Sequence, residues 1–414
     1  PDVMKAIQLL PGIQTQQEGS SLLIVRGGSP GQNLYLFDNI PVIYVNHLGG
    51  FLSTFNPDII NNIDVYKSGF PARYGDKISS VVDITQREGD FSAFKGNYSI
   101  GLTDLSLTLE GPTKLRNSSY FISGRKTMTE PLMFLLTNFG GGNNVRFVYG
   151  FHDVNGKFTW RPNSRNSLHF NLYQGDDYMI SWQKNNSLGV NEKYSLKNIW
   201  GNWLVSTRWN CALSPKIYLS NSLSYSRYRL RISNTYELNQ NGVNELFKSQ
   251  YLASLKDISF RTNLKYKLFR NWNIDLGQQT SFLSYIPDYS DISGQPKESK
   301  DIVNALNVAA YLDNTIKMGQ YSEANFGVRM VNYFTGSYYQ FVPEPRMNLT
   351  LGINKNNSIN LNYTFVSQFS HLMMTTGSIM ANEVWVPSNK NINPAKSNQY
   401  TAGWCSFFFN EMYR

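Results

Sequence analysis

The sequence is poor in the residues that build disulfide frameworks and metal sites. Its 414 residues include only two cysteines and four histidines. Cys211 and Cys405 fall on the sixth and fourteenth of the strands predicted below; strands lie about 4.8 Å apart, so the cysteines are beyond the reach of a disulfide and we expect two free thiols. None of the histidines has a cysteine or carboxylate neighbour at the spacing of metal ligands. No metal and no other cofactor is expected.

Charge and long apolar runs are scarce too. Charged residues make up 16% of the chain, whereas aromatic residues reach 14%. The longest apolar patch, 132–136, is far shorter than the roughly 18 residues that a membrane-spanning helix needs. A spanning helix is therefore excluded, but a membrane β-barrel is not, because alternating strands keep the mean hydropathy low.

Catalytic motifs are missing as well. The serine-rich stretches lack a G-x-S-x-G turn, and the glycines at 27–31 lack the lysine and helix of a phosphate-binding loop. The net charge of +9 would suit nucleic acid, but the basic residues are scattered and form no arm or basic helix. We expect a protein that is not an enzyme and binds no nucleic acid.

From residue 90 the sequence alternates between apolar and polar residues. Leu105, Leu107 and Leu109 are separated by polar residues, and the same pattern recurs at later segments. One face of each strand is thus apolar and the other hydrophilic. A β-sandwich gives the same alternation, so the periodicity alone does not decide the architecture.

The connections between strands do favour one architecture. We predict fourteen strands, at 94–102, 103–111, 118–127, 146–160, 166–180, 197–212, 216–232, 251–268, 272–285, 302–316, 321–334, 342–353, 358–370 and 398–409. Short polar turns alternate with long loops, predicted at 128–145, 181–196, 233–250, 286–301 and 371–397. Short turns on one side and long loops on the other are typical of an outer-membrane barrel. Trp160, Trp209 and Trp272 lie beside the short turns, as interfacial tryptophans would.

One predicted strand, 216–232, changes its pattern midway. Its apolar residues are odd-numbered at first, but Tyr228, Leu230 and Ile232 are even-numbered. Two explanations are open: a β-bulge shifts the register, or the strand continues beyond the membrane.

The stretch 19–89 is a small α+β unit with many turns. We predict strands at Leu22–Val25, Leu34–Phe37 and Val81–Ile84, and a tight hairpin at Asp38-Asn39. Asn56-Pro57-Asp58 predicts the start of a helix.

Five motifs in this stretch carry a resemblance to a known family. They are Ile24–Gly28, Asn33–Asp38, Asp64–Gly69, Ala72–Gly75 and Ser79–Ile84. In this order they resemble the plug domain of TonB-dependent outer-membrane receptors. The motif GFPARYG is most similar to that of family members from the Bacteroidetes. The stretches around 342–370 and 385–400 resemble barrel segments of the same receptors.

The resemblance implies an all-β membrane protein of the cell outer membrane, an antiparallel transmembrane β-barrel with an N-terminal α+β plug domain in its lumen. We expect the plug at 1–89 and the barrel at 90–414. These receptors have about 22 strands, so the chain would hold about 14 of them. It would begin inside the plug and lack about eight strands, and no signal peptide is present.

The resemblance also implies functional residues. The plug loops that face outward in these receptors match Gln32, Tyr44, Asn46 and His47, which we expect to bind ligand. The alternative is that they only pack the plug against the barrel wall.

Arg26 and Arg73 match arginines that anchor the plug to the barrel. A buried guanidinium needs a carboxylate partner, and we expect removal of Arg73 to loosen the plug more than removal of Arg125. The candidate partners, among which the sequence does not choose, are Asp104, Glu110 and Asp313.

The implied function is binding of an external solute and its import to the periplasm by energised plug rearrangement. The implied partners are TonB with the inner-membrane motor proteins, outer-membrane lipid, a SusD-like surface lipoprotein, and a small solute or oligomeric nutrient. That ligand is a glycan, a peptide, a siderophore or a cobalamin-like molecule. One alternative is a receptor-like structural subunit of an outer-membrane complex without transport activity. The other is a secreted β-rich adhesin.

Overall fold

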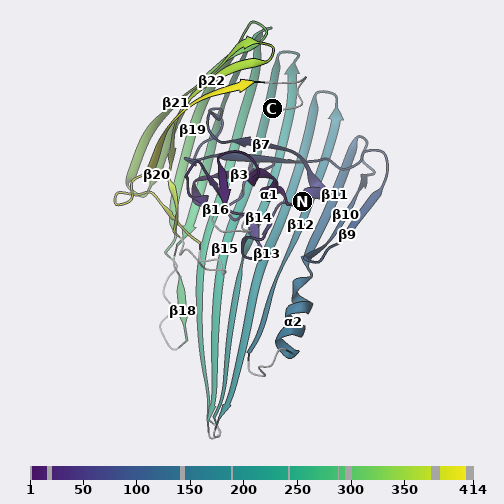
Figure 1. Cartoon of the computed structure of the whole chain (residues 1–414), viewed down its shortest axis with the longest axis vertical. Helices are drawn as coiled ribbons and strands as arrows, with labels where there is room; N and C mark the ends of the chain where they lie inside the picture. The colour runs from purple at the N-terminus through teal and green to yellow at the C-terminus, as the bar shows by residue number, and fades with distance from the viewer. Residues whose placement is uncertain are drawn as a thin grey trace.

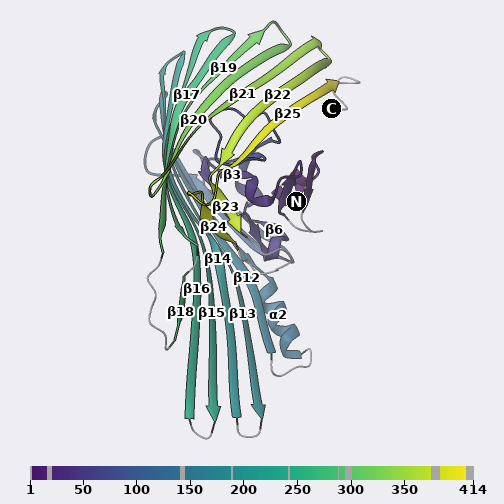
Figure 2. The ribbon, with the colours of Figure 1, turned by 90° about the vertical axis from the view of Figure 1, so that its left-hand side faces the viewer.

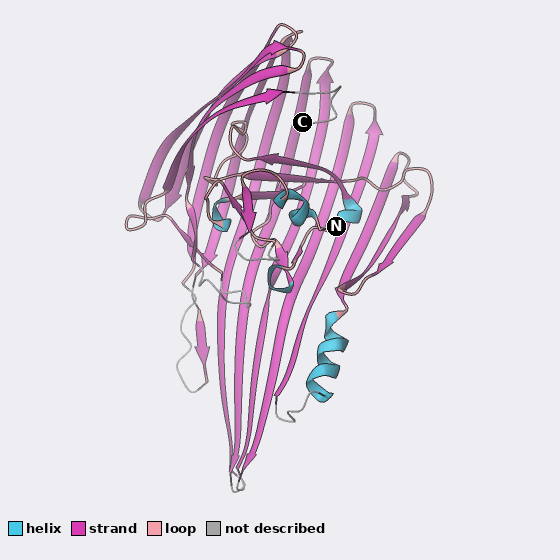
Figure 3. Ribbon diagram, viewed as in Figure 1, coloured by secondary structure: helices cyan, strands magenta, loops and turns pink. Residues whose placement is uncertain are grey.

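The chain folds into two parts, a large sheet and a smaller N-terminal unit. A computed structural model describes residues 2–15, 21–139, 145–187, 190–240, 243–287, 289–293, 301–373 and 383–406. One large curved sheet forms the outside, and the N-terminal unit lies against its concave face (Figures 1 and 2). Strands dominate the described residues (Figure 3), and no helix among them is long and apolar enough to span a membrane.

The large sheet is antiparallel and has 15 strands. Fourteen follow one path in chain order, and β18 pairs off this path with β16. The first seven are β9 (Lys95–Ile100), β10 (Asp104–Pro112), β11 (Ser118–Thr127), β12 (Val145–Asn163), β13 (Asn166–Ser187), β14 (Val190–Ser214) and β15 (Ile217–Gln240). The others are β16 (Val243–Phe269), β17 (Trp272–Ile286), β19 (Val303–Met318), β20 (Ser322–Thr335), β21 (Tyr338–Asn354), β22 (Asn357–Gln368) and β25 (Ala395–Ser406). Each corresponds to one of the fourteen predicted strands.

Two of the predicted long loops are wrong. β13 and β14 remain paired as far as Ser187 and Val190, and β15 and β16 as far as Gln240 and Val243. These four strands have 22, 25, 24 and 27 residues, whereas a tilted membrane strand needs about 9–11. They extend as a narrow blade beyond the rest of the sheet (Figure 1). Polar residues at 181–196 and 233–250 suggested loops, but backbone pairing requires no apolar face.

The other long connections contain short elements. Connection 128–145 holds helix α2 (Thr129–Phe139), and connection 286–301 holds β18 (Ser290–Ile292). In 371–397, strands β23 (Ser370–Met373) and β24 (Val384–Pro387) form a hairpin, of which 374–382 lie outside the described residues. This hairpin is folded toward the N-terminal unit (Figure 2).

The change of pattern in β15 is not a bulge. Its register with β16 is continuous from Ile217 to Gln240, so even-numbered residues face the concave side throughout. Tyr228 and Leu230 are buried there in an apolar cluster with Tyr44 and Leu48 of the N-terminal unit. The strand therefore continues past the level of its polar lumen residues, and its inner face becomes apolar where the N-terminal unit covers it.

The N-terminal unit is small and has many turns. Its elements are α1 (Val3–Gln8), β1 (Ile13–Thr15), β2 (Leu23–Val25), η1 (Pro30–Gln32), β3 (Leu34–Phe37), β4 (Ile40–Pro41), β5 (Asn46–His47), η2 (Leu48–Gly50), β6 (Leu52–Ser53), η3 (Pro57–Ile59), β7 (Ile60–Tyr66) and β8 (Val81–Gln86). A four-stranded sheet has the order β4-β3-β8-β7, with β3 and β8 parallel. It packs around an apolar core that includes Phe37, Phe55 and Ile84.

Two local predictions in this unit have different outcomes. The tight hairpin is confirmed, because Asp38 and Asn39 join β3 to β4 with φ angles of 52° and 67°. The predicted helix is wrong. The Asn56 side chain does accept a hydrogen bond from the Asp58 N–H, but only one 3-10 turn forms before β7. Pairing of β7 with β8 replaces the helix.

Candidate functional site: the contact between the N-terminal unit and the large sheet

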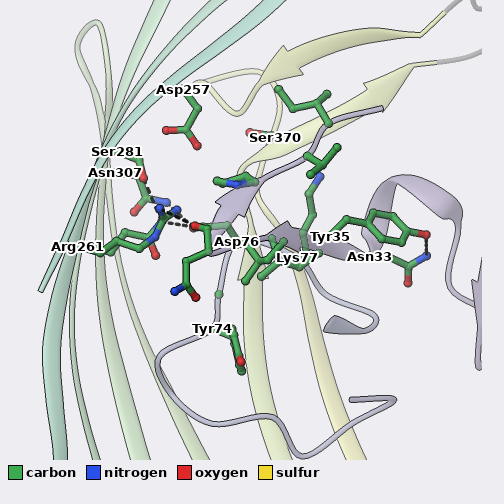
Figure 4. Close-up of a pocket in the computed structure, with 18 of the residues that line it drawn as sticks. Asn33, Tyr35, Tyr74, Asp76, Lys77, Asp257, Arg261, Ser281, Asn307 and Ser370 are labelled. Atoms are coloured by element: carbon green, nitrogen blue, oxygen red, sulfur yellow. Dashed lines mark hydrogen bonds between the residues drawn. The ribbon is translucent and has the colours of Figure 1, made fainter. Parts of the chain in front are cut away.

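A cavity of about 350 Å³ lies between the N-terminal unit and the large sheet. Asp76 and Lys77 of the N-terminal unit and Asp257 and Arg261 of β16 are among the lining residues that Figure 4 labels. The Asp76 carboxylate accepts hydrogen bonds from Asn307, at 2.5 Å, and from Gln279. The lining combines acidic, basic and amide groups with apolar side chains such as Leu34, Leu255 and Trp385, so this cavity suits a solute with both polar and apolar parts.

His47 lies between two carboxylates of the sheet. Its Nδ1 is 2.7 Å from Asp177 Oδ2, and its Nε2 is 3.2 Å from Asp153 Oδ2. The ring stacks on Phe151 with 4.3 Å between centroids. Burial lowers the pKa of His47, but Asp177 and Asp153 outweigh burial and raise it above its usual range. The imidazolium form is thus favoured at this contact.

Arg125 of β11 completes the same cluster. Its Nε and Nη2 donate to Asp153 Oδ2 at 2.9 and 2.7 Å, and Nη2 also donates to the Ser53 carbonyl at 2.9 Å. The Leu48 N–H donates to Asp177 Oδ1 at 3.1 Å. Arg125 is only 6% exposed, so the cluster joins β11, β12 and β13 to the N-terminal unit without solvent.

The other three predicted ligand residues lie in different settings. Tyr44 is buried; its N–H donates to Asn202 Oδ1 at 3.2 Å, and its ring stacks on Tyr228. Asn46 is buried and lines the cavity, and its Oδ1 has no hydrogen-bond partner among the described residues. Gln32 is half-buried, and its Oε1 accepts from the Ser29 N–H at 3.0 Å. The structure thus brings Tyr44 and His47 against the sheet, and ligand binding by the four residues stays a prediction.

Arg26 does contact the large sheet, through a hydroxyl. Its Nη1 donates to Thr401 Oγ1 of β25 at 2.8 Å and to Ser68 Oγ at 2.9 Å. The side chain of Arg73 instead bonds within its own unit. Its Nη2 donates to the Tyr74 hydroxyl at 2.6 Å, and that hydroxyl donates to Asp83 at 2.7 Å.

The expected carboxylate partners of these arginines are wrong. Among the described residues, no ion pair joins Arg26 or Arg73 to a carboxylate of the sheet. The three candidates are otherwise engaged. Asp313 accepts from the Ala72 N–H, Glu110 pairs with Arg87, and Asp104 accepts from Thr103.

Two arginines of the sheet were missed. Arg346 of β21 donates to the Pro71 carbonyl at 2.5 Å, and its guanidinium lies 4.9 Å from the Phe70 ring centroid. Arg329 of β20 donates to the Ala72 and Arg73 carbonyls at 3.5 and 3.4 Å. Both arginines fall on the hydrophilic face of alternating strands, which was a usable signal. Their acceptors are backbone carbonyls, which have no sequence signature.

The β23–β24 hairpin meets the N-terminal unit at Gly31. Lys77 Nζ donates to the Gly31 carbonyl at 2.9 Å, and Gln368 Nε2 donates to the same oxygen at 3.1 Å. A Cβ added to Gly31 would lie 2.6 Å from Cβ of Leu372. The absence of a side chain at Gly31 therefore permits the approach of the hairpin.

Two ionisable groups are buried at this meeting point. Burial lowers the pKa of Lys77 to about 7, against the opposing effect of Asp76. Burial raises the pKa of Glu383, beside β24, to about 8, against the opposing effect of Lys77. Both groups change charge near neutral pH.

Residues 1–81 match the family described as TonB-dependent Receptor Plug Domain. They are the plug domain of a TonB-dependent receptor. No curated protein matches the chain. The expected Bacteroidetes type and the expected plug boundary at residue 89 stay predictions.

Solved structures agree with the plug assignment in fold. A ferric enterobactin receptor (PfeA) mutant of Pseudomonas aeruginosa aligns with a TM-score of 0.63 and 16% identity, over 97% of this chain and 66% of that one. The siderophore receptor PirA of Acinetobacter baumannii gives 0.65 and 13%, over 97% and 65%. FpvA of P. aeruginosa, bound to heterologous pyoverdines, gives 0.67 and 13%, over 99% and 59%. The chain thus spans less than two thirds of the length of these receptors, between 59% and 66%.

The large sheet thus has the fold of the barrel wall of a TonB-dependent receptor, and the N-terminal unit is the plug that lies against it. Receptors of this fold are outer-membrane proteins. The matched proteins are receptors and not enzymes. The contacts between the N-terminal unit and the large sheet are therefore contacts between plug and barrel.

Proposed function

We propose that the chain acts in a TonB-dependent receptor that binds an external solute and imports it to the periplasm. TonB and the inner-membrane motor would supply the energy for a rearrangement of the plug. The observation that carries this proposal is the way the plug is held. Beside the apolar cluster around Tyr228 and Leu230, many hydrogen bonds and ion pairs hold it against the inner wall, and such bonds can form and break without unfolding either part.

The polarity of this contact supports movement. Barrel arginines bind plug carbonyls at Ser53, Pro71 and Ala72, and Lys157 of β12 pairs with Asp38 at 2.8 Å. Water or solute groups can replace such bonds one by one as the plug shifts, because each is a local polar contact. The cavity beside Asp76 is a space from which such a shift can begin.

The solute is proposed only as a class. Siderophore receptors are among the similar structures, but an identity of 13–16% carries the fold and not the ligand. Asn46 offers a free buried acceptor toward the cavity, and Gln32 offers an amide. We therefore propose a solute recognised mainly by hydrogen bonds. A SusD-like lipoprotein has no support in the comparisons and is not part of the proposal.

The test fixes the plug to the barrel by a reversible bond. Ser68 Oγ of the plug lies 3.0 Å from Thr401 Oγ1 of β25, so the double variant Ser68→Cys/Thr401→Cys places two thiols together. Cys211 and Cys405 are free in the structure and are replaced by serine beforehand. Uptake of solute is measured in cells with and without TonB, under oxidising and reducing conditions.

If the chain acts in a transporter, cells without TonB should take up no solute. The oxidised double variant should also lose uptake, and reduction of the disulfide should restore it. The single variants Ser68→Cys and Thr401→Cys serve as matched controls and should transport under both conditions. If no solute is taken up and growth is the same with and without TonB, the alternative of a structural subunit is correct instead.

A further inference from the structure

The outer surface of the barrel changes from apolar to basic within one row of paired residues. Val205, Tyr225, Ile258 and Phe282 are direct cross-strand neighbours on β14 to β17. Three of them are 42–47% exposed, as expected of side chains that face lipid. In the next outward-facing row toward the blade, the neighbours are Trp203, Arg227 and Lys256.

Four basic residues lie close together at this edge. Arg227, Arg229 and Arg231 alternate along β15 with the buried Tyr228 and Leu230, so all three arginines face outward. Lys256 on β16 pairs directly with Arg227. We call these four residues the basic rim.

The described residues balance only one of the four charges of the basic rim. Arg229 pairs with Asp176 at 2.7 Å, but the described residues supply no ion pair to Arg227, Arg231 or Lys256. The Nε atoms of Arg227 and Arg229 are buried without a hydrogen-bond partner in the described part of the chain. Like charges directly opposite each other on neighbouring strands are destabilising, so an arrangement like Arg227 beside Lys256 calls for an anion.

We propose that the basic rim binds the phosphate group of an anionic lipid in the outer leaflet. A guanidinium presents a planar fork that matches phosphate oxygens. The adjacent apolar row at Val205, Ile258 and Phe282 supplies the surface for acyl chains, which a free phosphate does not need. Trp203, 43% exposed, lies where an interfacial aromatic residue meets lipid headgroups.

This site is independent of the transport proposal, because it lies on the outside of the barrel. Its probe is lipid A, a lipid with two phosphate esters, added to the protein purified from membranes in a neutral detergent. Bound lipid is counted by native mass spectrometry. Parallel samples receive the same lipid with its phosphates removed, or inorganic phosphate as a competitor.

The test variant is Arg227→Gln/Arg231→Gln/Lys256→Gln. Its matched control, Lys184→Gln/Lys193→Gln/Lys248→Gln, removes three charges from the blade, on β13, β14 and β16. Each basic residue near a charged membrane surface raises the binding constant roughly fivefold. Loss of three such residues should therefore weaken the binding of lipid A about a hundredfold. The control variant should bind lipid A as the parent protein does. The dephosphorylated lipid should bind to neither of these proteins.

A second variant guards against misfolding of the first. Arg227→Lys/Arg231→Lys keeps the charge but loses the planar fork, and it should bind lipid A with intermediate affinity. Equal binding by parent and test variant, or equal binding of the dephosphorylated lipid, would overturn the proposal. Displacement of lipid A by equimolar inorganic phosphate would also overturn it, because the site would then recognise free phosphate.

Discussion

The ammonium group of Lys77, in the plug, lies 3.9 Å from the ring centroid of Trp385, in a barrel hairpin. Trp385 is 5% exposed, and Lys77 also donates to the Gly31 carbonyl. A cation over an aromatic face is most favourable when water is excluded. Plug and hairpin therefore meet through a charge whose presence depends on pH.

The first prediction concerns this pH dependence. The pKa of Lys77 is lowered to about 7, so the folded state binds fewer protons than the unfolded state between pH 7 and 10, and stability rises with pH there. The pKa of Glu383 is raised to about 8, so stability falls as pH rises from about 4.5 to 8. The hairpin should be least stable between about pH 7 and 8. Hydrogen exchange of β23 and β24, corrected for intrinsic rates, measures this.

Two variants separate the contributions. Lys77→Met should remove the gain above pH 7, and Glu383→Gln should remove the loss below pH 8. His371, whose pKa is lowered by burial and by Lys77, contributes mainly below pH 6.5 and is present in both variants. A hairpin of constant stability across this range in the parent protein would contradict the prediction.

The second prediction reverses the order expected from sequence for two arginines. Arg125→Ala should loosen the plug by about 3–5 kcal/mol, because it leaves the buried Asp153 with one charged partner fewer and frees the Ser53 carbonyl. Arg73→Ala should cost less, because Arg73 bonds to Tyr74 within the plug. Hydrogen exchange of residues 44–55 reports the difference. Arg125→Lys, which keeps the charge but loses the paired bonds, should be intermediate; a larger effect of Arg73→Ala would refute this assignment.

The third prediction tests the close approach at Gly31. Gly31→Ala should displace the hairpin and cost about 1–3 kcal/mol, because its new Cβ would meet Leu372. Leu372→Gly in the same chain, which removes the Cβ that the new methyl group would meet, should recover much of this loss. Protection of β23 and β24 against hydrogen exchange is the measurement. Gly124→Ala is the control, since nothing lies within 4 Å of its added Cβ, and equal protection in Gly31→Ala and Gly124→Ala would argue against a tight contact.

The number and order of the strands follow from the sequence. Alternation such as that of Leu105, Leu107 and Leu109 defines a two-faced strand, and short polar turns separate the strands on one side. Both signals are local, because they depend only on neighbours in the chain. The same local chemistry placed the Asp38-Asn39 hairpin. Free thiols at Cys211 and Cys405 were expected from the eight predicted strands between them, and the structure has both thiols free.

Local signals did not set the length of the strands. At 181–196 and 233–250 the blade extends beyond the rest of the sheet (Figure 1), so neither of its faces there needs to be apolar. Strand pairing there rests on backbone hydrogen bonds, which any residue except proline can make. A polar segment therefore looks the same in sequence whether it is a loop or a long hairpin.

Only the tertiary structure decided how the plug is held. The sequence indicated that Arg26 and Arg73 would meet carboxylates, but the barrel instead reaches plug carbonyls through Arg125, Arg329 and Arg346. Every residue carries a backbone carbonyl, so such a contact leaves no trace in the plug sequence. It arises where the curvature of the barrel brings a buried guanidinium to a turn of the plug, and that meeting joins segments as far apart in the chain as Pro71 and Arg346.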